Sequence, residues 1–491
     1  MNFLESLREQ MSLKETENGA VVYDSSFNPL IDFFGVVGAL RNSSIDSENM
    51  FIKAYSYSKE LTLKTLFYAR DCRGGLGERS TFRELYLTLI KVDPKTAINN
   101  LFNIPEFGRW DDLVYIYDKT LNPMVKETII NIFKTTLAHD YQEIGKGNNT
   151  NVTLLAKWLP SVRTGAGTNQ IARKIYKDMG YSKNEYKRVL SFLRTHLNIT
   201  EKNLSQSTLE KIEYSKVPSY AMKLYRKAFE RKDKRFIKFL DELEKGKTKI
   251  NSSTLFPYDL VRDYNFYDKV IEQQWKALPN YIDRPFKSLV CADTSGSMEG
   301  LPLEVSKSLA IYISERNTNP VFKDKFITFS DKPCFVSLSH CNNLIEKLRS
   351  MRCINSNTDL NAVFKLILKT SRINNVNPND MLESIIVISD MEFDTNERYS
   401  NHNNNICNQS TFIDNIKKEY ASFGYKLPKI IWWNVDARNE TFPMKYNDNC
   451  VYVSGCSPTV MKTVLMGEII TPMDYVKNTV DVPRYEKVKT F

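Results

Sequence analysis

Apolar residues recur at every third or fourth position through most of the first half of the chain. This spacing is typical of amphipathic helices, which bury one face and expose the other. Because strand-like alternation is nearly absent from this half, we predict short helices joined by polar links and stacked as an irregular, HEAT-like helical-repeat array. The clearest helical segments are residues 27–42, 60–71, 80–92, 111–121, 126–141 and 186–198.

The second half of the chain alternates short apolar runs with amphipathic segments. Short apolar runs indicate buried strands, and strands that alternate with helices indicate a doubly wound, Rossmann-like sheet. The predicted fold class is therefore α plus α/β. We expect strands at residues 288–293, 325–330, 333–338, 384–390, 429–436 and 449–457. We expect helices at residues 303–317, 342–351, 360–372, 411–424 and 459–470.

These patterns divide the chain into four segments. Residues 1–24 form an N-terminal extension, residues 25–284 the helical-repeat domain, and residues 285–470 the α/β domain. Residues 471–491 form a C-terminal tail that either packs back on the fold or is disordered. A chain of 491 residues exceeds what one hydrophobic core usually organises, which agrees with more than one domain.

Polar side chains follow two of the predicted strands. The first strand ends in Asp293, and Ser295 and Ser297 alternate with it along the chain, so that all three can converge on one point. Thr358 lies in an Asn- and Ser-rich loop before a predicted helix, and Asp390 ends a second strand. In doubly wound sheets ligands bind beyond the carboxyl ends of the strands, where both aspartates fall.

All-oxygen ligand sets with few carboxylates select hard divalent cations, and Mg²⁺ in particular. We therefore predict a site for Mg²⁺, or another hard divalent cation, formed by Asp293, Ser295, Ser297, Thr358 and Asp390. The alternative interpretation is that the first three residues belong to a polar turn and that Asp390 only caps a helix.

Three further acids lie close to these residues in the sequence. Asp359 directly follows Thr358 and either adds negative charge near the metal or caps the next helix. Glu392 and Asp394 follow Asp390 at the start of an Asn-rich insert. We expect the last two side chains to lie in solvent rather than in the site.

The formal net charge of +10 permits binding to phosphate backbones, and basic residues concentrate in two stretches. The first, residues 69–80, combines a glycine cluster with several arginines. It does not end in Gly-Lys-Ser/Thr after a strand, so we exclude a nucleotide-binding phosphate loop. It is either a tight turn between helices, whose arginines pair with acids such as Asp71 and Glu78, or a contact for an anion or RNA.

The second basic stretch, residues 214–240, interleaves lysines and arginines with aromatic residues. Such a helix can bind single-stranded nucleic acid. Alternatively, the aromatic side chains face the core and the lysines are merely solvated. The candidate RNA contacts of the two stretches are Arg70, Arg73, Arg79, Lys223, Arg226, Lys227, Arg231, Lys234 and Arg235.

The eight cysteines are scattered without a CxxC pair, which argues against a zinc site and for reduced thiols inside a cell. No run of about 18 apolar residues is present that would span a membrane. The N-terminal residues carry no apolar signal segment. We therefore expect an intracellular, cytoplasmic protein with no membrane partner.

The order Asp-x-Ser-x-Ser, loop Thr and strand-terminal Asp resembles the metal-ion-dependent adhesion site of von Willebrand factor A domains. A helical half followed by such a domain resembles the layout of the Ro autoantigen, or TROVE-module, proteins. The segments RDCRGGLGER, PEFGRWDDL, KVPSYAMKLYRKAFERKD, GKTKINSSTLFPYDLV and SDMEFD are also similar to an uncharacterised family of giant-virus, plant and protist proteins. The resemblance covers roughly residues 25–485.

This resemblance implies an RNA-linked role, because Ro-type proteins bind small noncoding RNA. We expect a non-enzymatic RNA-binding scaffold of the ribonucleoprotein type, in which the helical array holds RNA and the A domain closes the array or recruits a partner. The alternative is a Mg²⁺-dependent protein–protein interaction module that accepts an acidic side chain of its partner at the metal and binds no RNA. No positioned base, nucleophile triad or second metal favours an enzyme. A virion location is expected if the protein is viral, and the oligomeric state is left open.

Overall fold

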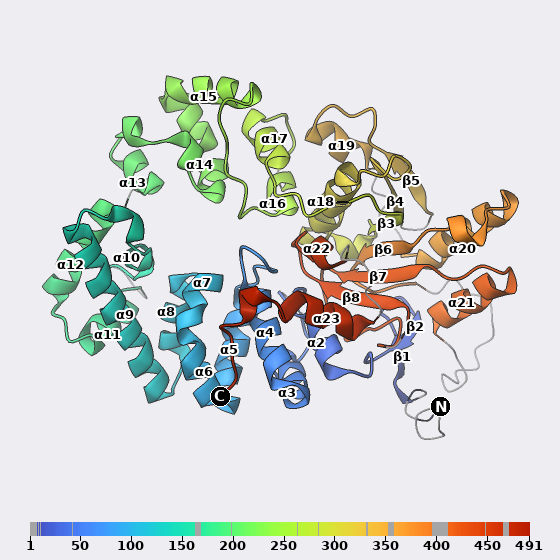
Figure 1. The fold of residues 1–491 in the computed structure, drawn as a ribbon, viewed down its shortest axis with the longest axis horizontal. Coiled ribbons are helices and arrows are strands. Elements are labelled where there is room, and N and C mark those ends of the chain that lie inside the picture. Colours follow the sequence, from blue (N-terminus) through green and yellow to red (C-terminus); the bar gives the residue numbers. More distant parts are fainter. Residues whose placement is uncertain are drawn as a thin grey trace. The chain divides into compact units, whose positions relative to one another are not determined.

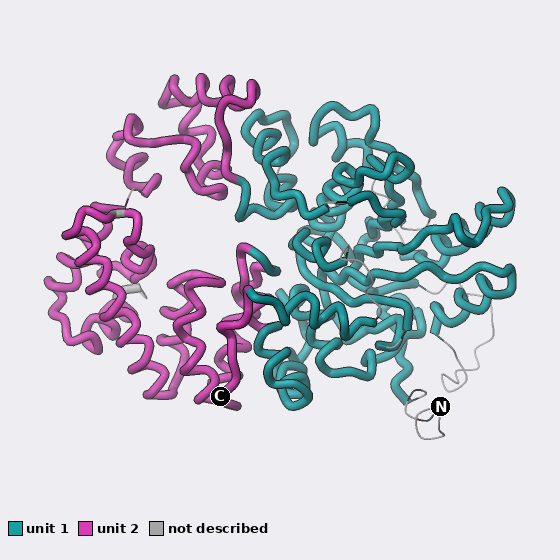
Figure 2. The backbone as a smooth tube through the Cα atoms, viewed as in Figure 1, with its two compact units in different colours: residues 1–65, 74–76, 252–483 teal, residues 66–73, 77–251, 484–491 magenta. Residues whose placement is uncertain are grey.

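The computed structural model describes residues 7, 9, 11–41, 43–162, 168–197, 199–262, 264–282, 284–329, 332–351, 358–394, 411–446, 448–464 and 471–491. The chain divides into two compact units, which Figure 2 shows in two colours. Unit 1 comprises residues 1–65, 74–76 and 252–483, and unit 2 comprises residues 66–73, 77–251 and 484–491. Each unit is therefore assembled from segments that are distant in the sequence.

Unit 1 is built on a six-stranded sheet with the strand order β5-β4-β3-β6-β7-β8 (Figure 1). Strand β5 pairs antiparallel with β4, and the other neighbouring strands pair parallel. Along the chain, β3, β4 and β5 form one half of the sheet from its centre outward, and β6, β7 and β8 then form the other half in the same way. The strands are β3 (Ser288–Asp293), β4 (Lys325–Phe329), β5 (Cys334–Ser337), β6 (Ser384–Ser389), β7 (Lys429–Asn434) and β8 (Cys450–Ser454).

The central strands are buried almost throughout because helices cover them. Helix α18 (Leu301–Arg316) packs against β3 and β4, and α2 (Pro29–Val36) packs against β7 and β8. The tryptophans Trp432 and Trp433 of β7 are fully buried. These contacts agree with the predicted α plus α/β class and explain the near-continuous apolar runs of the strands.

Further helices complete unit 1. Helices α20 and α21 pack on each other, and the hydroxyl of Tyr420 donates to the carbonyl of Phe364 at 2.8 Å. Helix α23 packs against α2 and β8. Their bounds, with those of the remaining helices of this unit, are α3 (Ser47–Tyr57), α16 (Pro257–Val261), α17 (Lys269–Lys276), α19 (Leu344–Ser350), α20 (Leu360–Ile373), α21 (Phe412–Ser422), α22 (Val460–Val464) and α23 (Pro472–Val480).

The first 65 residues belong to unit 1, which corrects the predicted domain start at residue 285. The backbone N–H of Gly38 donates to the Ser454 hydroxyl at 2.9 Å. A Cβ added to Gly38 would lie only 2.8 Å from the Cα of Gly455, so the two backbones are in close contact. The amphipathic pattern of α2 predicts that it buries one face, but does not say against which element. For that reason the sequence pattern placed it in the helical array.

The N- and C-terminal segments also differ from the predicted division. Within residues 1–24, β1 (Leu13–Glu15) and β2 (Val21–Tyr23) form an antiparallel hairpin. The tail at 471–491 divides between the units, since α23 belongs to unit 1 and residues 484–491 belong to unit 2. Of the two alternatives for the tail, packing on the fold is the one observed.

Unit 2 is helical, and its helices pack mainly on neighbours in the chain. Helix α5 packs on α6 and α8, α9 on α11 and α12, and α14 on α15. This packing agrees with the predicted stack of short helices. Helix α4 (Lys59–Arg70) contains the boundary between the units. The other helices are α5 (Ser80–Val92), α6 (Pro94–Asn100), α7 (Ile104–Phe107), α8 (Trp110–Lys119), α9 (Pro123–Gly145), α10 (Leu155–Trp158), α11 (Thr168–Asp178), α12 (Lys183–His196), α13 (Thr200–Ser205), α14 (Ser219–Lys232) and α15 (Lys234–Glu244).

Within the described ranges, no helix combines the length and the apolar character needed to cross a membrane.

Candidate metal centre and basic surfaces

Two aspartates lie at the carboxyl ends of neighbouring parallel strands. Asp293 ends β3, and Asp390 directly follows β6, which pairs with β3. This is the point in the sheet where the strand order reverses, between the half that contains β4 and the half that contains β7. Doubly wound sheets bind ligands at such a reversal, so the position itself favours a binding site.

Hydrogen bonds bring four of the five predicted metal ligands together. The Ser389 hydroxyl donates to Oδ2 of Asp293 at 2.6 Å, and its oxygen lies 3.4 Å from Oδ1 of Asp390. The backbone N–H of Ser295 donates to the other Asp293 oxygen at 2.9 Å. The hydroxyl oxygens of Ser295 and Ser297 are 3.1 Å apart. The alternation of residues 293, 295 and 297 therefore produces the predicted convergence.

The two carboxyl groups are buried close to each other. Burial raises the pKa of Asp293, and the negative charge of Asp390 raises it further. Burial also raises the pKa of Asp390, although the nearby Ser297 hydroxyl and Arg438 act in the opposite direction. The Oδ2 atom of Asp390 is buried, and it has no hydrogen-bond partner among the residues that the structure describes. A buried carboxylate oxygen without a partner is costly, so this donor set fits a bound divalent cation.

Arg438 is a basic residue beside this centre, and sequence reasoning missed it. Its guanidinium donates to the backbone carbonyl of Ser297 and lies 3.8 Å from Oδ2 of Asp390. Its guanidinium nitrogens also lie 3.4 Å from a carboxylate oxygen of Asp436 and 3.9 Å from a carboxylate oxygen of Glu17. Its side chain is 34% exposed, so this cation beside the buried Asp390 is partly accessible to solvent. No sequence signal identifies it, because its contact depends on the path of the loop after β7.

Thr358 is buried, but its backbone hydrogen-bonds with Asp394, which is not one of the predicted metal ligands. Its backbone N–H donates to Oδ2 of Asp394 at 2.7 Å, and its carbonyl accepts from the Asp394 N–H at 3.0 Å. Among the described residues, no hydrogen bond joins Thr358 to the other four predicted ligands. Asp359 caps α20 by accepting from the N–H of Ala362, which is one of the two roles predicted for it.

Glu392 is not in solvent, which corrects the expectation for this residue, whereas Asp394 is half-buried. The Glu392 side chain is fully buried and accepts from the backbone N–H of Glu17 at 2.8 Å. The Thr16 hydroxyl donates to the carbonyl of Phe393 at 2.6 Å. The turn between β1 and β2 therefore packs on the segment that follows Asp390, which explains why Glu392 is removed from solvent. The remainder of the Asn-rich insert lies outside the described residues.

The donor set differs from a cluster of acids and histidines. In the part of the chain that the structure describes, no group of three or more His, Cys, Asp or Glu side chains is arranged to hold a metal. The candidate centre instead combines two carboxylates with serine hydroxyls. Such a set suits Mg²⁺, which retains several waters and needs few protein carboxylates.

The first basic stretch is largely structural. Arg70 is 3% exposed and its Nε donates to Oδ2 of the buried Asp112 at 2.8 Å. This burial removes Arg70 from the candidate RNA contacts, because its guanidinium cannot reach a phosphate in solvent. Asp71 accepts from the guanidinium of Arg484 at 2.7 Å and from the backbone N–H of Arg73 at 2.9 Å. Arg73 donates to the carbonyl of Glu106, and Arg79 remains 53% exposed.

In the second basic stretch, several aromatic side chains face the core and most of the cations lie at the surface. The aromatic side chains of Phe229, Phe236 and Phe239 are buried, as expected if they face the core. The candidate contacts on α14 and α15 lie at or near the surface. Lys227, Arg231, Lys234 and Arg235 are exposed, and Lys223 and Arg226 are half-buried. Arg235 pairs with Asp233 at 2.6 Å.

Comparisons with known proteins agree with the two-part sequence pattern. The family model "Domain of unknown function (DUF2828)" matches residues 16–128 and 118–290, and "Domain of unknown function (DUF7788)" matches residues 287–490. The chain is 30% identical to "Uncharacterized protein L728" of Acanthamoeba polyphaga mimivirus over 509 residues, which cover 94% of this chain and 86% of the relative. The chain therefore belongs to the family that the DUF2828 model describes, and it is a relative of this mimivirus protein.

Proposed function

We propose that this protein is a non-enzymatic, Mg²⁺-dependent binding protein whose partner contributes an acidic side chain to the metal centre of unit 1. The observation that carries the proposal is the buried pair Asp293 and Asp390 on neighbouring strands, with one oxygen of Asp390 that no described residue hydrogen-bonds. A buried pair of like charges is unfavourable, and the single guanidinium of Arg438, 3.8 Å from Asp390, supplies one positive charge for two carboxylates. A divalent cation would balance both.

The residues that would hold the cation are Asp293, Ser295, Ser297 and Asp390, with Thr358 as the fifth ligand in the resemblance to von Willebrand factor A domains. When bound, Mg²⁺ supplies a coordination position for an oxygen atom of the partner. The Ser389 hydroxyl orients Asp293, and the turn at Thr16 to Gly19 supports the segment after Asp390. We also propose that unit 1 is a von Willebrand factor A-like domain and that the helices form a HEAT-like, TROVE-like repeat domain.

A selection from random peptides tests this function. The full chain is immobilised in Mg²⁺, exposed to a displayed peptide library and eluted with EDTA. We expect the eluted peptides to share an Asp or Glu, and the Asp390→Asn variant to recover none of them. The matched control is Asp380→Asn, because Asp380 is an exposed aspartate elsewhere in unit 1. Eluted peptides without a shared acid, or equal recovery by Asp390→Asn, would contradict the proposal.

RNA binding by unit 2 is a second candidate function, supported by one exposed face of α14. Tyr220, Leu224, Lys227 and Arg231 follow one another at intervals of three or four residues, which places them along one stripe of the helix. The Tyr220 ring is 59% exposed, unlike the buried aromatic residues of the same stretch. An exposed ring beside cations is a surface on which a base can stack while the cations contact phosphates.

Salt dependence and substitution test this second candidate. We expect affinity for single-stranded RNA to fall steeply with salt concentration, because phosphate contacts release counterions. The Tyr220→Ala variant should weaken binding by about tenfold, as expected for the loss of one stacked base. Phe192→Ala provides a control, since Phe192 is a partly exposed ring on α12. A salt-independent affinity, or equal losses in both variants, would exclude RNA binding at this face.

A further inference from the structure

The exposed side of helix α20 in unit 1 combines cations with aliphatic side chains. Lys365, Lys369 and Arg372 are exposed on it, and α20 itself contains no acidic residue. Leu366 is 42% exposed and Ile373 is 68% exposed. Intervals of three, four and seven residues place these side chains along one side of the helix. This surface is therefore both cationic and apolar.

The opposite side of α20 fixes the helix in place. Val363, Phe364 and Leu368 are buried in the core of unit 1. At the C-terminal end of the helix, the Tyr425 hydroxyl forms a 3.1 Å hydrogen bond with the carbonyl of Ser371. The exposed aliphatic side chains therefore stand on a helix that is anchored along its length.

A third apolar side chain, Phe423, lies beside the end of α20. It directly follows α21 and is 42% exposed. The guanidinium carbon of Arg372 lies 3.5 Å from the centroid of its ring. Phe423 thus extends the same surface. We call this surface the α20 face, and it consists of Lys365, Leu366, Lys369, Arg372, Ile373 and Phe423.

Helix α20 runs between the two edges of the sheet. It begins beside Thr358, whose partner Asp394 follows the carboxyl end of β6. The C-terminal end of α20 leads to the start of β6 at Ser384 (Figure 1). The exposed Ile373 therefore lies toward the edge opposite the candidate metal centre. A ligand at this end of the α20 face would not compete with one at Asp390.

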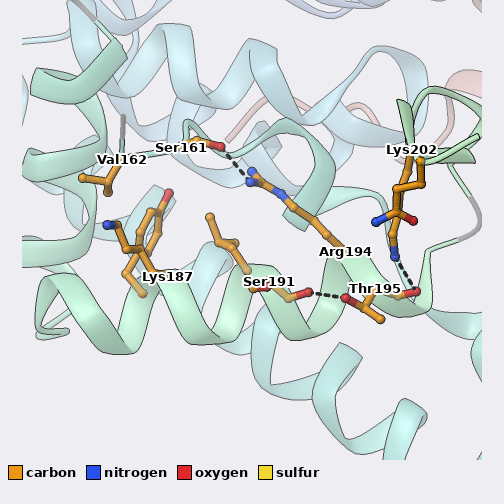
Figure 3. Close-up of a pocket in the computed structure, with 10 residues that line it drawn as sticks. Ser161, Val162, Lys187, Ser191, Arg194, Thr195 and Lys202 are labelled. Atoms are coloured by element: carbon orange, nitrogen blue, oxygen red, sulfur yellow. Dashed lines mark hydrogen bonds between the residues drawn. The ribbon is translucent and has the colours of Figure 1, made fainter. Parts of the chain in front are cut away.

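The cationic pocket of unit 2 differs from the α20 face. Its volume is about 410 Å³, and Figure 3 shows Lys187 and Lys202 at its two ends. Tyr186 and Leu190 in its wall are buried. Both surfaces carry positive charge, and the α20 face adds strongly exposed aliphatic side chains to it.

We infer that the α20 face binds the surface of a lipid bilayer that contains anionic lipids. Lysine and arginine side chains are attracted to anionic headgroups, while apolar side chains enter the boundary between the headgroups and the acyl chains. Single-stranded RNA would also attract the cations, but Leu366 and Ile373 have no ring on which a base can stack. The combination of charge with aliphatic side chains therefore favours lipid over RNA.

This inference departs from the expectation of no membrane partner that the sequence gives. That expectation depends on the absence of an apolar run long enough to span a bilayer and of a signal segment. Neither criterion detects a folded helix that lies on a membrane surface, because such a helix needs only one exposed face with suitable side chains.

Cosedimentation of the full chain with lipid vesicles tests the inference. One vesicle type is pure phosphatidylcholine, and the other contains about one third phosphatidylserine. We expect binding to the mixed vesicles that weakens with added salt, and no binding to the pure phosphatidylcholine vesicles. The Lys369→Gln/Ile373→Ser variant removes one cation and one aliphatic side chain. It should weaken binding to the mixed vesicles by at least about tenfold.

The matched control is Ile52→Ser/Lys53→Gln, because α3 exposes an aliphatic side chain and a cation at these adjacent positions. The Lys187→Gln/Lys202→Gln variant controls for the loss of charge alone. Both controls should bind the mixed vesicles like the unchanged protein. Asp293→Ala should do so as well, which separates this test from that of the metal centre. Thermal melting verifies that each variant is folded.

Three results would contradict the inference. The first is that the unchanged protein does not bind the mixed vesicles, or binds both vesicle types equally. The second is that Lys369→Gln/Ile373→Ser and the controls weaken binding equally. The third is that this variant loses affinity for single-stranded RNA while the unchanged protein binds no vesicles, which would assign the α20 face to RNA.

Discussion

The hydroxyl of Ser389 donates a 2.6 Å hydrogen bond to the carboxylate of Asp293, and Asp390 is the next residue in the chain. This contact connects the ends of β3 and β6, the two strands between which the strand order reverses. It orients one aspartate and lies directly beside the other. Groups that orient metal ligands in this way usually influence metal affinity about 10- to 100-fold.

Mn²⁺ serves here as the probe ion for the proposed Mg²⁺ site, since both cations prefer oxygen ligands. We expect Ser389→Ala to weaken Mn²⁺ binding by at least about tenfold, because the Asp293 carboxylate loses the donor that orients it. Isothermal titration of the full chain measures the effect. Ser384→Ala is the matched control, since Ser384 lies at the opposite end of the same strand and pairs with Ser288. Equal affinities of the two variants would show that Ser389 does not support a metal centre.

Arg438 is expected to compete with the cation. Its guanidinium lies 3.8 Å from Oδ2 of Asp390, the oxygen to which no described residue donates a hydrogen bond. Replacing it by glutamine removes a positive charge that repels a divalent cation, so Mn²⁺ should bind about tenfold more tightly. Arg262→Gln, at a 59% exposed arginine of unit 1, should leave the affinity unchanged. Weaker binding by Arg438→Gln would mean that Arg438 supports the centre through its contact with Ser297.

The buried ion pairs of unit 2 give a prediction for stability. Asp112 is fully buried and pairs with both Arg70 and Arg83, at 2.8 and 2.7 Å. Asp112→Asn leaves these guanidinium charges without their buried counterion, so the free energy of unfolding should fall by about 3 kcal/mol. Urea unfolding measures this loss. The neighbouring Asp111 is partly exposed, and Asp111→Asn should cost much less. Similar losses would contradict the structural role assigned to Arg70.

The contact between Gly38 and Gly455 provides a stability test for unit 1. A Cβ on Gly38 would lie 2.8 Å from the backbone N and Cα of Gly455, so Gly38→Ala requires a backbone shift. We expect it to reduce the free energy of unfolding by about 2 kcal/mol, the usual effect of overpacking. Gly296→Ala is the control, because nothing lies within 4 Å of its added Cβ. An unaffected Gly38→Ala variant would argue against packing of the N-terminal segment on the sheet.

Part of the candidate centre could be predicted from the sequence for a physical reason. The carboxyl ends of parallel strands meet at one edge of a sheet, so the sequence alone predicts that Asp293 and Asp390 lie close together. The serines follow Asp293 at alternate positions, and this local geometry was sufficient to place them. Thr358 was not predictable in the same way, because its backbone pairs with Asp394, 36 residues later in the chain.

Contacts between distant segments explain the remaining differences. Arg70 carries no sequence signal for burial, since its partner Asp112 lies 42 residues away. The helical pattern of α2 predicts an apolar face but not the strand that covers it. Sequence periodicity predicts which face of a helix or strand is buried. It does not predict which other element packs on that face, and the division into units depends on this packing.

Titration of the full chain with Mn²⁺, followed by electron paramagnetic resonance, tests the proposed metal centre most directly. We predict a single tightly bound Mn²⁺ per chain that Mg²⁺ displaces. The same titration of the Asp293→Ala and Asp390→Asn variants should show no bound ion, while Asp380→Asn behaves like the unchanged protein. Absence of a bound ion in the unchanged protein, or its retention in both centre variants, would contradict the account.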